Sequence, residues 1–457
     1  MSRAELNTKS LRHLVPILAG TIAVWLCGCS LTRSPAAEQP TGMRVEEPAR
    51  KPAGQPAGMG AAADWVHFLG PNYDGIAPLD KFDPKGLTEV WSRELGPGCS
   101  SVTVAEGRLF TMGNRADRDI VYCLDPKTGD EKWTFGYDCE LMPKLYEGGP
   151  NSTPTIADGR IYTLSRKGQV YCLDAESGEK IWEASYGQWS PKGGWWGFSD
   201  SPVVWGDKVF VNLTDKGMAL ARATGTVVWS GERAVPAYAT ILPLPEGNPV
   251  VDRAALVVQT CRTLNVLAPA TGESMLGGAP EWAQRKSNNN AVSPKVYGSG
   301  LLVMHAATGL SKISRAGGEW TEEWLCPEFA YGGGDWFTFN RQVIHGKYLY
   351  AIAGRGKGAR CRLECVNLDT GAIEWTRPEA FGNLILAADK LMIVTEMGEI
   401  AWGALDGNAY NETFRQKLLD GGVGADTDGP YWSHPVLHDG HLYVRSNKGK
   451  LTCFRLE

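Results

Sequence analysis

The sequence has little charge and few histidines for its length. Only 21% of its 457 residues are Asp, Glu, Lys or Arg, seven are His, and the formal net charge is −5. Without an excess of positive charge the chain has no general attraction for nucleic-acid phosphates, which argues against a nucleic-acid function. The low charge and a hydrophobic content of 43% also exclude a disordered chain and a long coiled coil.

The sequence also lacks an apolar run of the roughly 20 residues that a membrane-spanning helix needs. The apolar stretch 14–26 is shorter, follows three basic residues and ends in Leu-Cys-Gly-Cys. This order is typical of a signal peptide, which we predict over residues 1–28. The ending resembles the lipobox of bacterial lipoproteins, which implies a lipid on Cys29; a plain uncleaved anchor is the alternative. Ser30, in place of Asp, implies the outer rather than the inner membrane.

Residues 29–62 are predicted to be a disordered tether that begins at the lipidated cysteine. Five prolines stand among Ala, Gly, Glu and Arg with almost no bulky apolar side chain, so this segment cannot bury enough surface to fold. Residues 63–86 form an N-terminal extension. Residues 87–457 form the folded domain, because no linker-like stretch interrupts them.

Tryptophan is abundant, with 17 residues, and much of it belongs to a repeat. The segment 123–133, Cys-Leu-Asp-Pro-Lys-Thr-Gly-Asp-Glu-Lys-Trp, returns at 172–182 and 366–375, and in weaker form at 224–229 and 271–276. Each copy predicts a strand, a tight Asp/Gly turn and a second strand. Most copies are preceded by another strand, which begins with Pro and ends in a tight turn. Two hairpins per unit make a four-stranded antiparallel sheet.

The residues that close these units recur at intervals of 39 to 51 residues, which is the spacing of propeller blades. They are Trp91, Trp133, Trp182, Trp229, Leu276, Trp324, Trp375 and Phe414. The last unit, 435–457, has no closing strand of its own, and residues 87–93 supply one. We therefore predict an all-β fold, an eight-bladed β-propeller of four-stranded antiparallel blades whose last blade is closed by an N-terminal strand. Two smaller β domains are the alternative.

The Leu-Asp-x-x-Thr-Gly-x-x-x-Trp units resemble the tryptophan-docking repeats of the pyrroloquinoline-quinone (PQQ)-repeat β-propellers. Residues 65–75, Trp-Val-His-Phe-Leu-Gly-Pro-Asn-Tyr-Asp-Gly, resemble the segment before the propeller in a bacterial branch of that family. The resemblance implies that each closing residue docks structurally between neighbouring blades. The family includes quinoprotein dehydrogenases, which hold PQQ and Ca²⁺ in the central funnel. It also includes BamB-like envelope lipoproteins, which bind protein partners.

The inner strands are expected to begin around the central channel, mostly with Ser and Thr, which crowding at the axis explains. The exceptions carry larger polar groups: Asp200, Asn340, Arg341, Asn383 and His434. Three interpretations follow: a water-filled, hydrogen-bonded channel mouth, a small-ligand or ion site, and a catalytic site.

The loops that lead to these openings are rich in aromatic residues, among them Trp195, Trp196, Trp336 and Trp432. Rigid aromatic rings give contact area at low entropic cost, so these loops suggest a face that binds a ligand or partner. The alternative is that the loops fold over the funnel and plug it.

No metal site is predicted. His434, His438 and His441 would converge on a helix, but here they flank a hairpin turn and their side chains diverge. Asp200 and Arg341 supply fewer charges than PQQ and Ca²⁺ should need. The adjacent Cys pair that quinoprotein alcohol dehydrogenases place against PQQ is absent.

The sequence therefore predicts a non-catalytic, lipid-anchored envelope propeller, monomeric and without a cofactor, that binds a protein partner. A quinoprotein dehydrogenase holding PQQ and Ca²⁺ is the second hypothesis. A saccharide-binding module that uses the loop aromatics is the third.

Overall fold

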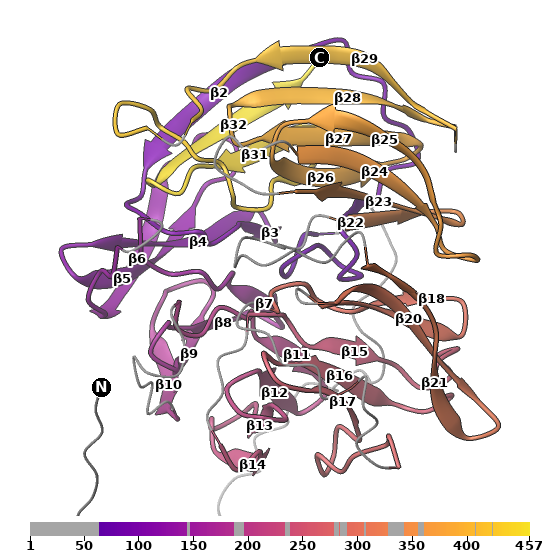
Figure 1. Cartoon of the computed structure of the whole chain (residues 1–457). Helices are drawn as coiled ribbons and strands as arrows, with labels where there is room; N and C mark the ends of the chain where they lie inside the picture. The colour runs from indigo at the N-terminus through magenta and orange to yellow at the C-terminus, as the bar shows by residue number, and fades with distance from the viewer. Residues whose placement is uncertain are drawn as a thin grey trace, which may run out of the picture. The chain divides into compact units, whose positions relative to one another are not determined.

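Short apolar strands alternate with tight turns along the chain, and this pattern folds into eight antiparallel sheets (Figure 1). The computed structural model describes residues 64–143, 147–186, 196–233, 238–277, 283, 290–305, 308–327, 342–354, 361–406, 408–422 and 424–457. In this part of the chain no helix has the length and apolar character that a membrane crossing requires.

The eight sheets are the blades of a β-propeller, which confirms the predicted fold class. The strands of the first four blades, from the inner strand outward, are β3 (Thr103–Ala105), β4 (Arg108–Arg115), β5 (Arg118–Leu124) and β6 (Glu131–Asp138) in blade 1; β7 (Thr155–Ala157), β8 (Arg160–Leu164), β9 (Gln169–Asp174) and β10 (Lys180–Ser185) in blade 2; β11 (Val203–Trp205), β12 (Lys208–Val211), β13 (Met218–Ala221) and β14 (Val227–Ser230) in blade 3; and β15 (Leu242–Leu244), β16 (Ala255–Gln259) and β17 (Leu264–Leu267) in blade 4.

The other four blades follow in chain order, and the last two also use strands from the N-terminal part of the chain. They are β18 (Lys295–Tyr297), β19 (Gly300–His305), β20 (Gly309–Ala316) and β21 (Glu319–Cys326) in blade 5; β22 (Gln342–His345), β23 (Tyr348–Ala353), β24 (Cys361–Asn367) and β25 (Ile373–Glu379) in blade 6; β26 (Gly382–Ala387), β27 (Lys390–Thr395), β28 (Glu399–Leu405) and β29 (Tyr410–Lys417), with β1 (Ile76–Ala77) beside β26, in blade 7; and β30 (Val436–His438), β31 (His441–Arg445), β32 (Lys450–Leu456) and β2 (Leu87–Glu94) in blade 8.

The wheel is closed by strands from the two ends of the propeller. β2 pairs antiparallel with β32 from Leu87 opposite Leu456 to Glu94 opposite Lys450, with a bulge beside Trp91. The predicted closure by an N-terminal strand is therefore confirmed. It leaves no unpaired inner or middle strand at the join, where an open edge would invite aggregation.

Closing tryptophans lie in the seams between blades. The indole N–H of Trp91 donates to the carbonyl of Pro126 at 3.0 Å, and Trp133, Trp182 and Trp229 make the equivalent bond to the next blade at 2.9 to 3.1 Å. Each of these four rings also tilts onto an aromatic residue of its own blade, as Trp91 does onto Tyr443. A closing tryptophan thus adds a hydrogen bond and apolar contact at once.

The turn that receives each indole must contain glycine. Gly129 has a φ of +71°, and a Cβ built on it would lie 2.6 Å from the Trp91 ring. Asp125 shapes this turn, because its carboxylate accepts from the backbone N–H of Lys127 at 2.9 Å. The same approach of a Trp ring to a turn glycine recurs in four further seams, at Gly178, Gly225, Gly272 and Gly371.

Blades 4 and 7 depart from this pattern. In blade 4 the described part of the expected fourth strand is reduced to one bridge, Leu267 with Ser274, and Leu276 is only partly buried. At this seam the tryptophan comes from blade 5 rather than blade 4: the indole N–H of buried Trp320 donates to the carbonyl of Met275 at 3.4 Å.

In blade 7 the closing residue Phe414 stacks on Trp402 of its own blade, with centroids 3.7 Å apart. The next blade explains this difference. The third and fourth strands of blade 8 come from opposite ends of the chain, so no turn joins them and there is no slot for a closing ring. Phe82 of the N-terminal extension packs edge-on against Trp402 instead, at 6.0 Å.

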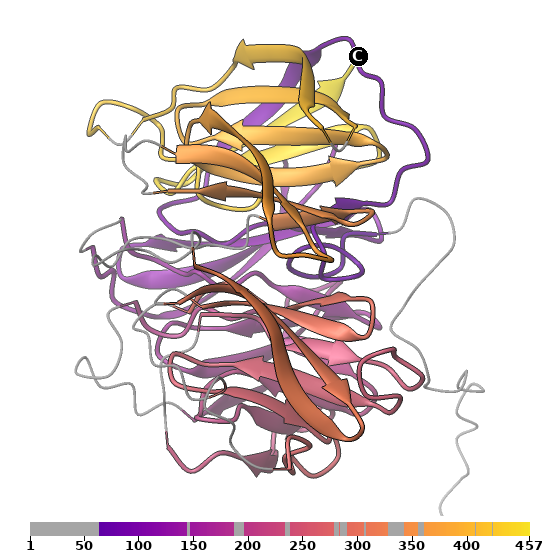
Figure 2. The same ribbon diagram turned by 45° about the vertical axis from the view of Figure 1, so that its right-hand side comes forward.

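The N-terminal extension also packs into one end of the axis of the wheel. Trp65 forms an antiparallel bridge with Val104 of β3, Val66 accepts a bond from Ile156 of β7, and β1 pairs parallel with β26. We call residues 65–77 the plug, because they touch inner strands on opposite sides of the ring. Figures 1 and 2 show this indigo segment at the centre of the blades, before the chain runs outward to β2.

Side chains of the plug are buried among the inner strands. His67 stacks on Tyr73 with centroids 3.6 Å apart, and burial lowers the pKa of His67 to about 4. Lys295 of β18 donates to the backbone carbonyl of Asp74 at 3.1 Å, and burial lowers the pKa of this lysine to about 8. The plug is therefore part of the core rather than an appendage.

Candidate functional site

Asp200, the acidic residue expected at the channel mouth, is fully buried. Its Oδ2 accepts the backbone N–H of Asn212 at 2.8 Å, and burial raises the pKa of its carboxyl group to about 7. Asn212 in turn donates to the carbonyls of Ala239 and Gln259, at 3.0 and 2.9 Å. The carboxyl group thus helps to order the junction of blades 3 and 4.

The small hydroxyl residues at the strand openings form a belt of hydrogen bonds around the axis. In this hydroxyl belt, a backbone N–H of one blade donates to the hydroxyl oxygen of the next. The pairs are Ser101 to Thr153 (3.0 Å), Thr153 to Ser201 (3.0 Å), Ser201 to Thr240 (3.2 Å) and Thr240 to Ser293 (3.0 Å). Crowding alone, the reason given from the sequence, is therefore incomplete: the hydroxyl groups join neighbouring inner strands.

Asn383 and His434 continue these contacts in blades 7 and 8. The side-chain amide of Asn383 donates to the carbonyls of Tyr431 and Ser433, at 3.2 and 3.0 Å. His434 Nε2 lies 3.1 Å from the Leu384 carbonyl, and its ring lies against Trp65 and Phe68 of the plug, with centroids 6.3 and 6.1 Å apart. The His434 carbonyl accepts the hydroxyl of Ser101 at 2.5 Å, which joins blade 8 to blade 1.

The aromatic residues that were expected to face a ligand divide into two groups. Trp432 is 7% exposed, packs in the core with Phe381, and donates its indole N–H to Glu396 at 3.0 Å, so it does not offer an open contact surface. Trp196 is partly exposed. Trp195, Trp336, Asn340, Arg341 and the predicted lipidation site Cys29 lie outside the described residues.

The PQQ-repeat family model described as "Outer membrane protein assembly factor BamB" matches residues 117–377, more than half of the chain. The chain belongs to this family. The crystal structure of BamB from Moraxella catarrhalis is 16% identical, with a TM-score of 0.56, and the match covers 81% of this chain and 100% of that one.

A europium-containing methanol dehydrogenase has the same fold at 13% identity and a TM-score of 0.59, with 86% of this chain and 98% of that chain covered. A computationally designed protein, Ika8, matches at 9% identity and a TM-score of 0.52 over 80% and 98%. At such identities the likeness concerns the fold alone. No curated protein sequence matches the chain.

The described residues at the axis do not fit the PQQ and Ca²⁺ of the family's dehydrogenases. Ca²⁺ takes six to eight oxygen ligands, whereas no group of three or more His, Cys, Asp or Glu in the described ranges could hold a metal ion. One Asp200 oxygen is already bonded to the backbone, and four of the belt's hydroxyl oxygens accept bonds from neighbouring blades. The plug occupies one end of the axis.

Exposed apolar side chains lie on the outer rim. The described residues include five exposed large hydrophobic side chains, and three of them are on the outer strands of blades 2 and 3: Ile181 on β10, and Val227 and Val228 on β14. These two strands are neighbours, because Trp182 of β10 packs on Gly225, just before β14. The sequence analysis considered loop aromatics as a binding face and did not consider these strands.

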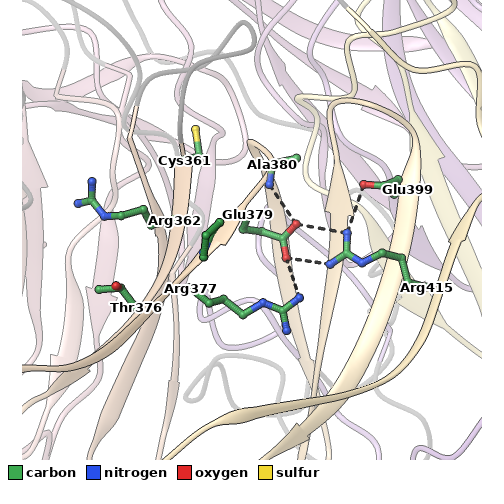
Figure 3. A pocket seen from close by; sticks show the side chains of 9 residues that line it. Cys361, Arg362, Thr376, Arg377, Glu379, Ala380, Glu399 and Arg415 are labelled. Atoms are coloured by element: carbon green, nitrogen blue, oxygen red, sulfur yellow. Dashed lines mark hydrogen bonds and ion pairs between the residues drawn. The ribbon is translucent and has the colours of Figure 1, made fainter.

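Blades 6 and 7 are joined by ion pairs beside an open pocket of about 620 Å³ (Figure 3). Arg415 of β29 bonds Glu379 of β25 through both terminal nitrogens, at 2.8 and 3.3 Å, and also contacts Glu399 and Glu412. The Glu379 side chain is 3% exposed and accepts the Ala380 N–H at 3.0 Å. No repeated sequence signal pointed to this pocket, since its charged residues occur in one pair of blades only.

Proposed function

We propose that this protein is a non-catalytic envelope scaffold that binds a protein partner. On this proposal a lipid on Cys29 anchors it, at the outer membrane rather than the inner one. Membership of the BamB family supports the envelope location and the binding of a protein partner. The observation that carries the non-catalytic part is the occupied axis: the plug packs at one end of it, and four hydroxyl oxygens of the belt already accept hydrogen bonds from neighbouring blades. On this proposal neither PQQ nor Ca²⁺ is required.

The partner surface that we propose is the rim formed by β10 and β14. Outer strands have free backbone N–H and C=O groups, which can add a strand from another protein. On β14, Val227 and Val228 are 45% and 46% exposed and stand side by side without a charged residue in the strand. By contrast, β25 contains Pro378, which cannot donate to an added strand.

Site-specific photo-crosslinking in the envelope tests the scaffold proposal. A photoreactive residue at position 228 should trap a discrete partner. The same residue at Val90, which is 43% exposed on the outer strand β2 of blade 8, is the matched control and should trap little. Equal trapping at both positions would contradict the rim assignment.

Calorimetry with PQQ and Ca²⁺ separates the scaffold from the dehydrogenase. We expect no saturable binding and no dye-linked oxidation of alcohols or sugars. Stoichiometric PQQ binding that disappears in Asp200→Ala would make the dehydrogenase the better assignment.

A further inference from the structure

A buried arginine at the seam of blades 8 and 1 bonds only neutral groups among the described residues. Arg445, at the end of β31, is 2% exposed. Its Nη1 donates to the hydroxyl of Thr111 at 2.6 Å and its Nη2 to the carbonyl of Gly96 at 3.0 Å, whereas its Nε has no hydrogen-bond partner. A buried charge is costly unless an opposite charge compensates it. An anion near this guanidinium would therefore be stabilised.

Two groups that can lose a proton act on Arg445. Burial lowers the pKa of Arg445 to about 10, and the electrostatic interactions with Cys99 and Tyr122 oppose this lowering. The hydroxyl of Tyr122 donates to the carbonyl of Leu95 at 3.0 Å, and burial raises its pKa, so it stays neutral. Arg115 adds a second positive charge, 5.5 Å from the centroid of the Tyr122 ring. The thiol of Cys99 is therefore the group that can supply the missing negative charge.

Backbone hydrogen bonds hold Cys99 near the guanidinium. The N–H of Gly98 donates to the carbonyl of Asn447, two residues after Arg445, at 2.9 Å. The N–H of Cys99 itself donates to the carbonyl of Pro150, also at 2.9 Å. The thiol is thus presented from a segment that is fixed on both sides of the seam.

Cys99 is also the only one of the nine described cysteines that is not buried. Burial raises the pKa of six of the others to about 11 or 12, which keeps their thiols protonated and unreactive. They are Cys123, Cys139, Cys172, Cys261, Cys365 and Cys453. Reactive cysteines are partly exposed and lie near positive charge, and Cys99 combines these two conditions.

We propose that Cys99 is a thiol–disulfide exchange site for small disulfides, with Arg445 as the positioning residue that stabilises its thiolate. The thiolate attacks one sulfur of a disulfide R–S–S–R′. A bond forms between the Cys99 sulfur and S–R, the S–S bond of the reagent breaks, and R′–S⁻ leaves and takes up a proton. The protein then carries one small thiol as a mixed disulfide, which a second thiol can remove. This reactivity does not rest on the scaffold proposal.

Reaction of the folded full chain with dithiodipyridine, an uncharged disulfide, tests the site. We expect one fast equivalent per chain, at least tenfold faster at pH 7 than any other described cysteine, and peptide mass spectrometry should place it on Cys99. The rate should fall on acidification with a midpoint below about pH 8.5, the value of an ordinary thiol. The absence of a fast equivalent, a label only on other residues, or a midpoint at or above about 8.5 would overturn the proposal.

Variants separate the effect of the guanidinium from that of the thiol. Cys99→Ser should remove the fast equivalent. Arg445→Met keeps the volume but not the charge, so it should slow labelling at pH 7 about tenfold and raise the midpoint by about one pH unit, and Arg445→Lys should restore part of the rate. The control Arg118→Gln removes an exposed arginine that pairs with Asp138 on blade 1, and should change neither value.

An unchanged rate and midpoint in Arg445→Met would overturn the role of the guanidinium. If Arg445→Met does not fold, the midpoint of the parent and that of Arg445→Lys still decide, because an uninvolved guanidinium leaves both at the value of an ordinary thiol.

Glutathione disulfide and envelope extracts distinguish two sources of the disulfide. A single glutathione adduct on Cys99, removed by dithiothreitol, supports exchange with small molecules. A reducible band of higher mass that is absent from Cys99→Ser, together with no glutathione adduct, would assign the exchange to a partner protein and overturn the small-molecule assignment.

Discussion

The seam between blades 8 and 1 and the seam between blades 7 and 8 reach closure by different means. In the first, Trp91 lies on Gly129 and bonds the Pro126 carbonyl, as in the seams that follow it. In the second, Phe414 turns onto Trp402 of its own blade. The difference is the turn between third and fourth strands, which blade 1 has and blade 8 lacks. A closing tryptophan is therefore useful only where the next blade offers a glycine turn.

Truncation at the seam closed by β2 should have the largest effect on the stability of the propeller. Removing residues 30–94 deletes the plug and β2, so β32 loses its partner and the chain should aggregate or melt well below the parent. Removing residues 30–62 should leave the melting temperature unchanged. Thermal unfolding followed by circular dichroism checks both, and equal stability of the two truncations would refute the closure scheme.

A pair of glycine variants should measure the docking contact itself. Gly129 and Gly107 share a φ near +70°, but a Cβ at Gly107 would meet nothing within 4 Å, whereas one at Gly129 would clash with Trp91. We expect Gly129→Ala to lower the free energy of unfolding by about 3 kcal/mol, and Gly107→Ala by about 1 kcal/mol. Urea unfolding of the two variants decides it; equal losses would show that backbone strain alone matters.

The ion pairs between blades 6 and 7 should matter somewhat less. Arg415→Gln would leave Glu379 nearly buried with only the partial support of Arg377, and should cost about 2 kcal/mol. Arg118→Gln breaks an exposed pair with Asp138 and should cost less than about 1 kcal/mol. Similar urea midpoints for the two variants would show that the network does not hold these blades together.

Asp200 should produce an effect of about the size expected for Arg415→Gln, but one that depends on pH. Its folded pKa, about 7, lies above the unfolded value of 3.8, so the folded state binds the proton more tightly. Its contribution to stability is therefore full below pH 3.8 and is lost as the pH rises through 7. Asp200→Asn keeps an acceptor for Asn212 and should gain about 2 kcal/mol relative to the parent between pH 5 and pH 8. A pH-independent difference would contradict the buried, protonated carboxyl group.

The repeat made most of the fold predictable from the sequence. Asp125 and Gly129 are needed to form the turn, and Trp133 is needed on the strand that follows it. The same residue types recur at these positions in the regular blades. The packing of the N-terminal extension against the inner strands could not be predicted from such local patterns. Trp65 acts through contacts with Val104 and His434, which lie farther along the chain, and no local pattern encodes those contacts.

The candidate site was less predictable for a related reason. The polar residues at the axis were recognised as exceptions. A sequence does not show, however, whether the side chains of Asp200 and Asn383 bond to the backbone or are available to bind a ligand. Trp432 looked like a loop aromatic and is part of the core. Arg377 and Arg415 follow no repeat, so only the fold brings them to one pocket.

The pairing of β2 with β32 sets an order of events during synthesis. Leu87 is made long before its partner Leu456, and Thr88 contacts Glu457 across 369 positions of sequence. Until the last residues emerge, β2 has no strand to pair with and the plug has no completed ring around it. Joining segments so distant in sequence is entropically costly and slow. An incomplete chain therefore exposes both the apolar plug and an open blade, which are the surfaces that a chaperone would have to cover.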